Sequence, residues 1–190
     1  MLKERLGDLP VFIENDANCA ALGEAYAGCG HGCKNFVAIT LGTGVGSMQI
    51  EGGVCTKRIP GLGYILGDEG SGTVMGRMLL ADVFDNQLPP HLEKLFHEEY
   101  NISINEVLDC TYHQPAPNRF FGRFTPFLSK HINEEYCRGI VRYNFEQFTK
   151  RNLSKYDVER MSVNFVGSVA AVFEDILTEV LEEYGMKKGV

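Results

Sequence analysis

The stretch NFVAITLGTGVGSMQIEGG, residues 35–53, decides the fold class. Residues 35–41 are apolar on both alternating faces, a pattern typical of a central strand that is buried on both sides. A run of glycines from Gly42 then turns the chain, residues 47–50 return it, and Gly52 with Gly53 turns it again. Because strands joined by such short turns pair antiparallel, the sequence predicts a strand meander.

The flanking regions predict the rest of an α/β domain. Residues 10–13 look like a short buried strand, residues 15–27 like an Ala-rich helix, and residues 162–166 like another strand. Residues 71–156 have helical patterns, including an apolar stripe that contains Tyr136, Ile140, Tyr143 and Phe148. Residues 169–184 place apolar side chains from Val169 to Tyr184 on one face of a single helix.

We therefore expect three parts: an α/β segment over residues 1–70, a mostly helical block over 71–158, and a returning strand and helix over 159–190. Residues 186–190 resemble the approach to a further strand. The sequence predicts a fold that is incomplete at both ends.

Composition and charge exclude several classes of protein. The 190 residues carry 18 Lys and Arg against 25 Asp and Glu, a formal charge of −7, which argues against a nucleic-acid binder. No apolar run reaches the ~18 residues of a membrane helix, and the first residues lack the apolar core of a secretion signal. We expect a cytoplasmic protein with small-molecule ligands and no membrane or nucleic-acid partner. The oligomeric state stays open, with a homodimer as one option.

The cysteine content does not indicate a disulfide scaffold, since six cysteines are few for this length. Cys29, His31 and Cys33 form the one cluster with metal-ligand spacing. A structural zinc site needs four ligands, usually in two pairs, and no second pair follows. We interpret the cluster as a Gly-rich turn and predict no metal ligand, while metal binding by these three residues stays an open alternative.

Asp16 lies just beyond the predicted first strand and opens a helix. Asn15 or Asp16 would make a good N-cap, which is one interpretation. The other is a catalytic carboxylate, because α/β folds place ligands at the C-terminal ends of strands. A helix N-terminus favours the ionised carboxylate, which can accept a proton from a substrate hydroxyl.

Gly42, Thr43 and Gly44 form a turn suited to phosphate binding. Glycines let the backbone approach a ligand, and successive N–H groups can form an anion nest. The Thr43 hydroxyl can add a contact to a phosphate. The alternative is a plain β-turn, and the pattern is neither a Walker A loop nor a dinucleotide loop that opens a helix.

Two further loops carry candidate binding residues. In Gly67-Asp-Glu-Gly-Ser-Gly72, Asp68 and Glu69 either form an acidic turn ahead of a helix capped by Ser71, or bind sugar hydroxyls or a metal-bound water. At Gly167 and Ser168 the chain turns from a strand into a helix. Glycine there would let an adenosine lie against the backbone, although many such turns look alike.

Taken together and in this order, the loops resemble the sugar kinase/Hsp70/actin (ASKHA) superfamily, whose domains are ribonuclease H-like. The front, FIENDANCAALGE at residues 12–24 with FVAITLGTGVG at residues 36–46, is similar to ROK-type glucokinases. That resemblance implies that Asp16 is the catalytic base and that Asn15 contacts the sugar. It also implies that Gly42, Thr43 and Gly44 form the second phosphate loop.

From about residue 56 to 190, the chain resembles the N-acetylglucosamine kinase branch of the BadF/BcrA-type ATPases. The residues that carry this similarity are IPGLGYILGDEGSG at 59–72 and QPAPNRFF at 114–121. It implies that Asp68 and Glu69 line the sugar pocket and that Gly167 and Ser168 contact adenosine. The implied activity is phosphorylation of a hexose or amino sugar with ATP and Mg²⁺.

Two departures from these families affect the expectation. After the hairpin the chain lacks the Glu-x-Gly-His and cysteine zinc signatures of ROK kinases, so it reads as a natural mosaic or a fusion joined near residues 44–56. It also lacks the Asp-x-Gly-x-Thr motif of the first phosphate loop, so we expect the 190 residues alone to be inactive or nearly so. An activator ATPase with an iron–sulfur cluster and a non-catalytic sugar sensor stay as alternatives, and the identity of the sugar stays open.

Overall fold

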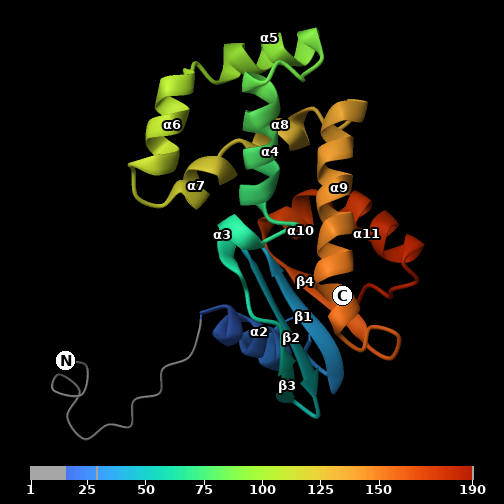
Figure 1. The fold of residues 1–190 in the computed structure, drawn as a ribbon. Coiled ribbons are helices and arrows are strands. Elements are labelled where there is room, and N and C mark those ends of the chain that lie inside the picture. Colours follow the sequence, from blue (N-terminus) through green and yellow to red (C-terminus); the bar gives the residue numbers. More distant parts are fainter. Residues whose placement is uncertain (1–15, 29, 190) are drawn as a thin grey trace, which may run out of the picture.

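A computed structural model describes residues 16–28 and 30–189, and it has the mixed α/β fold that the sequence predicts (Figure 1). Its sheet has four strands in the order β3-β2-β1-β4. The strands are β1 (Asn35–Leu41), β2 (Val45–Glu51), β3 (Val54–Arg58) and β4 (Ser162–Val166). The first three form the predicted antiparallel meander, and β4 pairs parallel with β1.

Helices provide most of the remaining structure. Figure 1 shows α4–α8 gathered at one end of the sheet, while α9 runs from that group down alongside the strands. The described helices are α2 (Asp16–Ala27), α3 (Gly63–Leu66), α4 (Gly72–Phe84), α5 (Pro90–Glu99), α6 (Ile104–Tyr112), α7 (Pro117–Gly122), α8 (Thr125–Lys130), α9 (Glu135–Arg151), the 3₁₀ turn η1 (Leu153–Lys155), α10 (Ser168–Val172) and α11 (Glu174–Glu183).

Strand β1 is buried on both faces, as its pattern predicts. Val37, Ile39 and Leu41 join the main core with the helices α4 and α9. Phe36 and Ala38 face the opposite side, where they pack in a smaller cluster with β2. Helix α2 packs against β1 and β2. This central strand therefore provides a rigid base for the turn that follows it.

Two helical predictions are wrong. Residues 169–184 do not form one helix, because Phe173 turns its side chain into the core with non-helical backbone angles and separates α10 from α11. Val172 is 57% exposed and Tyr184 is also exposed, so neither lies on a buried face. Tyr143, expected on the apolar stripe of α9, is 51% exposed, because the buried face of α9 centres on Val141, Phe145 and Phe148.

At the C-terminal end of the described chain, a short segment lies beside β4, in the region where the sequence predicts the approach to a further strand. The N–H of Val163 donates to the Lys187 carbonyl and that of Gly189 to the Val163 carbonyl, so residues 187–189 run beside β4. The strand expected at residues 10–13 lies outside the described residues.

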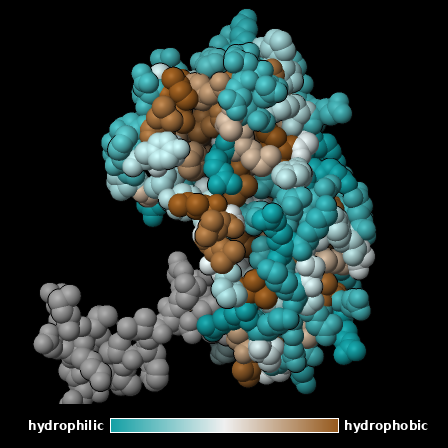
Figure 2. Space-filling model, viewed as in Figure 1, coloured by the Kyte–Doolittle hydropathy of each residue, from teal (hydrophilic) through white to brown (hydrophobic). Residues whose placement is uncertain are grey.

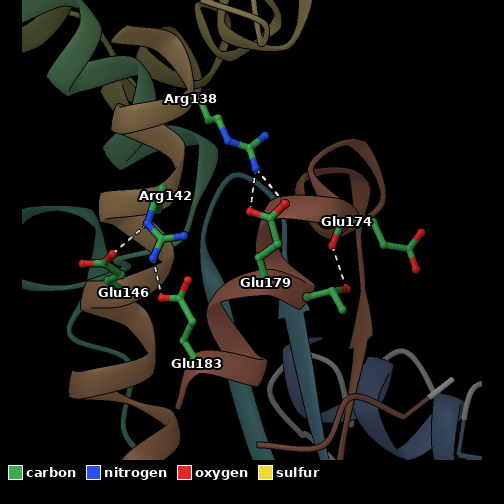
Figure 3. A network of polar contacts seen from close by, with 7 residues as sticks. Arg138, Arg142, Glu146, Glu174, Glu179 and Glu183 are labelled. Atoms are coloured by element: carbon green, nitrogen blue, oxygen red, sulfur yellow. Dashed lines mark hydrogen bonds and ion pairs between the residues drawn. The ribbon is translucent and has the colours of Figure 1, made fainter. Parts of the chain in front are cut away.

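Ion pairs connect α9 to α11 on the surface (Figure 3). Arg138 donates to both carboxylate oxygens of Glu179, at 2.7 and 2.5 Å. Arg142 pairs with Glu146 on its own helix and with Glu183 on α11. Exposed pairs of this kind contribute little free energy each, so the buried face of α11 carries most of the stability of this contact. Among the described residues, no helix has the length and apolar character needed to cross a bilayer.

Candidate functional site

The turn between β1 and β2, residues 42–44, lies against the first turn of α4. We call it the hairpin. The Gly42 N–H donates to the Gly44 carbonyl at 3.1 Å, which closes the turn. The Gly72 N–H donates to the Gly42 carbonyl at 2.9 Å, and the Thr73 hydroxyl donates to the Thr43 carbonyl at 2.5 Å. The hairpin is thus fixed from the side of α4.

One pocket, which we call the hairpin pocket, opens beside Gly42 and Thr43 and has a volume of about 290 Å³. It contains three of the residues predicted to bind nucleotide: Gly42, Thr43 and Ser168. Sequence reasoning missed the remaining wall, which comes from the helices and comprises Gly72, Gly122, Thr125, Pro126, Ser129, Val169, Val172 and Phe173. The structure therefore brings four segments that are distant in sequence together at the end of β1.

Gly167 has a structural reason to be glycine. Its φ is +116°, and a Cβ there would lie 2.3 Å from the carbonyl oxygen of Leu41. Only glycine lets the turn after β4 pass this close to β1, which brings Ser168 beside the hairpin. Gly167 does not line the hairpin pocket, so its predicted contact with adenosine stays a prediction.

A second pocket, which we call the acidic-loop pocket, has a volume of about 270 Å³. Both predicted sugar-binding carboxylates, Asp68 and Glu69, line it. The other lining residues are Val45, Ser47, Ile59, Pro60, Gly61, Leu62, Leu66, Gly67, Arg151, Asn152 and Lys155. Figure 2 shows apolar side chains over α3 next to this region, where Leu62 and Leu66 are exposed.

Asp68 lies between this pocket and the hairpin. Its φ is +62°, a left-handed conformation that is uncommon for a residue other than glycine. Burial raises the pKa of its carboxyl, the N–H of Val45 donates to it and lowers the pKa, and the negative charge of Glu69 raises it again. Its Oδ2 lies 3.1 Å from where a Cβ on Gly44 would be. Gly44 lines neither pocket, and its missing side chain leaves room for this carboxylate.

The rest of the acidic loop is held by α9 and α4. Arg151 Nη1 donates to Glu69 Oε1 at 2.7 Å, and the Glu69 side chain is only 17% exposed. The Gly70 N–H donates to the buried Asn144 side chain at 3.4 Å. Ser71 caps α4 by accepting from the Val74 N–H, as predicted. Arg151 and Asn144 were not identified from the sequence, since nothing in the pattern of α9 indicates which polar residue faces the loop.

Asp16 begins α2, but its side chain and the whole of Asn15 lie outside the part of the chain that the structure describes. Their roles as base and sugar ligand, and the N-cap alternative, stay predictions.

The structure describes only part of the cysteine cluster, because Cys29 falls outside it. The N–H groups of His31 and Cys33 donate to the carbonyls of Gly28 and Gly30, as in a tight turn. No three His, Cys, Asp or Glu side chains of the described residues are placed to hold a metal ion.

Comparison with known proteins gives a family likeness for the front of the chain. Residues 1–83 match the ROK family. A glucokinase of Halalkalibacterium halodurans is 45% identical over 69 residues, which is 35% of this chain and 21% of the relative. A glucokinase of Thermotoga maritima is 45% identical over 71 residues, or 37% of this chain and 19% of the relative. The predicted glucokinase-like front is confirmed.

Solved structures extend the likeness to nearly the whole chain. A proposed N-acetylglucosamine kinase from Porphyromonas gingivalis is 34% identical with a TM-score of 0.83, covering 89% of this chain and 59% of its own. A ROK family glucokinase from Streptomyces griseus, solved with glucose and AMPPNP, has a TM-score of 0.58 at 18% identity, covering 98% of this chain and 62% of its own. The chain therefore shares its fold with these two proteins, and it spans less than two thirds of either.

Proposed function

We propose, from the likeness to ROK glucokinases and N-acetylglucosamine kinases, that this chain is the catalytic part of an ATP-dependent hexose or amino-sugar kinase. The observation that carries the proposal is the position of the hairpin between two pockets. Gly42 and Thr43 line one pocket, and Asp68, against Gly44, lines the other. A phosphoryl donor and a hydroxyl acceptor need to approach one another from two such sides.

The hairpin pocket suits a nucleotide. No described residue accepts a hydrogen bond from the N–H of Thr43, which lines this pocket, or from that of Gly44, which follows it without lining the pocket, so both donors are available for phosphate oxygens. Val169, Val172 and Phe173 offer an apolar wall for a base, and Thr125 and Ser129 of α8 also line the pocket. Mg²⁺ would neutralise the phosphate charge when bound, but its aspartate belongs to the first phosphate loop, whose motif does not occur in residues 1–190.

The acidic-loop pocket suits a sugar. Carboxylates accept hydrogen bonds from hydroxyl groups, and Asp68 and Glu69 provide two next to each other. Arg151 holds Glu69 in place, while Leu62 and Leu66 offer apolar contact for the carbon-bound hydrogens of a sugar ring. We infer that Asp68 and Glu69 orient the acceptor sugar rather than perform the proton transfer.

In the proposed mechanism, the oxygen of the sugar hydroxyl forms a bond to the γ-phosphorus of ATP while Asp16 accepts the proton of that hydroxyl. The bond between the γ-phosphorus and the oxygen that bridges to the β-phosphate breaks at the same time, which releases ADP. Phosphoryl transfer passes through a loose transition state that depends on positioning and charge neutralisation. The N–H groups of the hairpin would hold the phosphate oxygens during this step. Position at the start of the twelve-residue helix α2 favours the ionised form of Asp16.

A coupled assay of ADP release over a panel of glucose, N-acetylglucosamine and N-acetylmannosamine tests the proposal. We expect the 190 residues alone to give background rates, and the same chain preceded by the first lobe of the P. gingivalis relative to release ADP only when a sugar is present. Sugar binding without sugar-dependent ADP release in the extended protein would contradict the kinase and favour a sugar sensor. A visible spectrum and iron analysis test the activator alternative.

A further inference from the structure

Two successive peptide groups of the hairpin have their carbonyls bound from α4. Gly72 N–H holds the carbonyl of Gly42 at 2.9 Å, and the Thr73 hydroxyl holds that of Thr43 at 2.5 Å. Both donors belong to the junction between the acidic loop and α4. The direction of each peptide group is therefore set by α4.

These contacts also determine where the hairpin N–H groups point. The described peptide bonds are all trans, so the C=O and N–H of each peptide group face opposite ways. With the carbonyls of Gly42 and Thr43 turned toward α4, the N–H groups of Thr43 and Gly44 face away from it. Successive N–H groups that face one way form a concave site for an anion.

Thr73 is itself held on a rigid frame. Its side chain is fully buried, and its hydroxyl lies 3.0 Å from the Asn118 carbonyl in α7 as well as 2.5 Å from that of Thr43. Helix α7 packs closely on α4, because a Cβ at Gly76 would lie 2.0 Å from the carbonyl oxygen of Phe121. A single hydroxyl thus connects the hairpin to two packed helices.

We infer that Thr73 is a positioning residue, whose buried hydroxyl orients the Thr43–Gly44 peptide group for phosphate binding. Thr73 does not line the hairpin pocket, so it acts through Thr43 rather than by touching a nucleotide. The part of the inference that concerns nucleotide affinity rests on the proposed function, whereas the orientation of the hairpin does not.

Three variants of the 190-residue chain separate the hydroxyl from other effects. Thr73→Val removes the hydroxyl at nearly constant shape, and Thr73→Ser retains it. Thr149→Val is the matched control, because Thr149 is also fully buried and no described group hydrogen-bonds its hydroxyl.

Amide hydrogen exchange read by NMR tests the orientation directly. The N–H groups of Gly42 and Gly72, which both bond within the hairpin contact, should exchange at least five-fold faster in Thr73→Val. In Thr73→Ser and Thr149→Val the change should stay within two-fold. Unchanged exchange in Thr73→Val overturns the inference, as does equal acceleration in Thr73→Ser, which would assign the effect to the methyl group.

Calorimetric titration with AMPPNP and with N-acetylglucosamine tests the link to function. We expect the Kd for AMPPNP to rise about ten-fold in Thr73→Val, to recover in Thr73→Ser, and the Kd for the sugar to stay constant. An unchanged Kd for AMPPNP in Thr73→Val overturns the role in nucleotide binding. Absence of AMPPNP binding in the unaltered chain would count against the proposed function, while the exchange result would still decide the orientation.

Discussion

Asp68 has two features that each reduce the stability of the folded protein. Its backbone lies in the left-handed region, which an aspartate tolerates better than most residues because its short side chain bonds locally, and its carboxyl is partly buried beside Glu69. Strained backbone and a raised pKa both reduce stability and occur together at functional sites. This combination supports a role for Asp68 in binding rather than in folding.

Replacing Asp68 by Asn should stabilise the protein at neutral pH. The pKa of Asp68 in the folded state is above 3.8, its ordinary value, so the folded protein retains the proton longer than the unfolded chain. Stability therefore falls as pH rises through that window, by linkage. Asparagine keeps the left-handed backbone and can still accept from the Val45 N–H.

We expect Asp68→Asn to raise Tm by about 2 °C at pH 7, with the difference shrinking as pH falls toward 3.8 and lost well below it, where the carboxyl is protonated in both states. Thermal unfolding across pH 3–8 measures this. A variant less stable than the parent at pH 7 would show that the carboxylate stabilises the fold.

Replacing Asp16 by Asn should abolish phosphoryl transfer while leaving the fold and sugar binding largely intact. The amide has nearly the same shape but cannot accept the sugar's proton, and general-base catalysis contributes about 10²–10⁴-fold. The measurement is turnover in the protein extended by the first lobe, with the Kd for sugar as control. Near-normal turnover in Asp16→Asn would exclude this residue as the base.

Single glycines show what the sequence could and could not predict of the site. Glycines at 42, 44 and 167 were expected in turns where the backbone comes close to a ligand; the structure places all three in turns, and ligand binding there stays a prediction. The specific reason for each glycine was not predictable. Gly44 leaves room for the carboxylate of Asp68, and Gly167 leaves room for the carbonyl of Leu41, and these neighbours come close only in the folded chain. Thr73 was missed for the same reason, because its acceptors lie 30 and 45 residues away in sequence.

At the scale of elements, α4 organises the site. Its N-cap Ser71 ends the acidic loop, its first turn fixes the hairpin, and Gly76 on its next turn lets α7 approach closely. Any side chain at position 76 would collide with the backbone of Phe121 rather than with a flexible side chain. The contact between α4 and α7 therefore cannot adapt locally.

Gly76→Ala should destabilise the protein by at least about 2 kcal/mol, as overpacking against backbone does. The matched control is Gly139→Ala on α9, where nothing lies within 4 Å of the added Cβ and alanine should stabilise the helix by about 0.5–1 kcal/mol. Urea unfolding of both variants measures the difference. Equal stability of the two variants would show that α7 moves freely on α4.

The elements themselves were predictable to different degrees. Strand β1 and the meander follow from alternation and glycine turns, which are local signals. The break between α10 and α11 was not predictable. Phe173 fits the apolar periodicity of one continuous helix, but its backbone is not helical and its side chain is buried in the core. Tyr143 was misplaced because its spacing from Ile140 fits a helical stripe, and the position of the buried face depends on which neighbours α9 meets.

At the scale of the whole molecule, one continuous cluster of buried side chains joins the sheet, the helical block and α11. Both pockets are built on this cluster, with the hairpin between them. Val45 and Ile59 of the acidic-loop pocket and Val169 and Phe173 of the hairpin pocket pack in or against this close-packed core. Under the proposed function, this shared core would orient a donor in one pocket relative to an acceptor in the other, as transfer between two substrates requires.

The most direct test of this account is amide hydrogen exchange of the 190-residue chain with and without AMPPNP and Mg²⁺. Binding of the nucleotide phosphates at the hairpin predicts slower exchange at residues 42–44 and 168–173, with residues 91–99 on the remote helix α5 unchanged. Slowed exchange elsewhere, with residues 42–44 unaffected at saturating nucleotide, would contradict it.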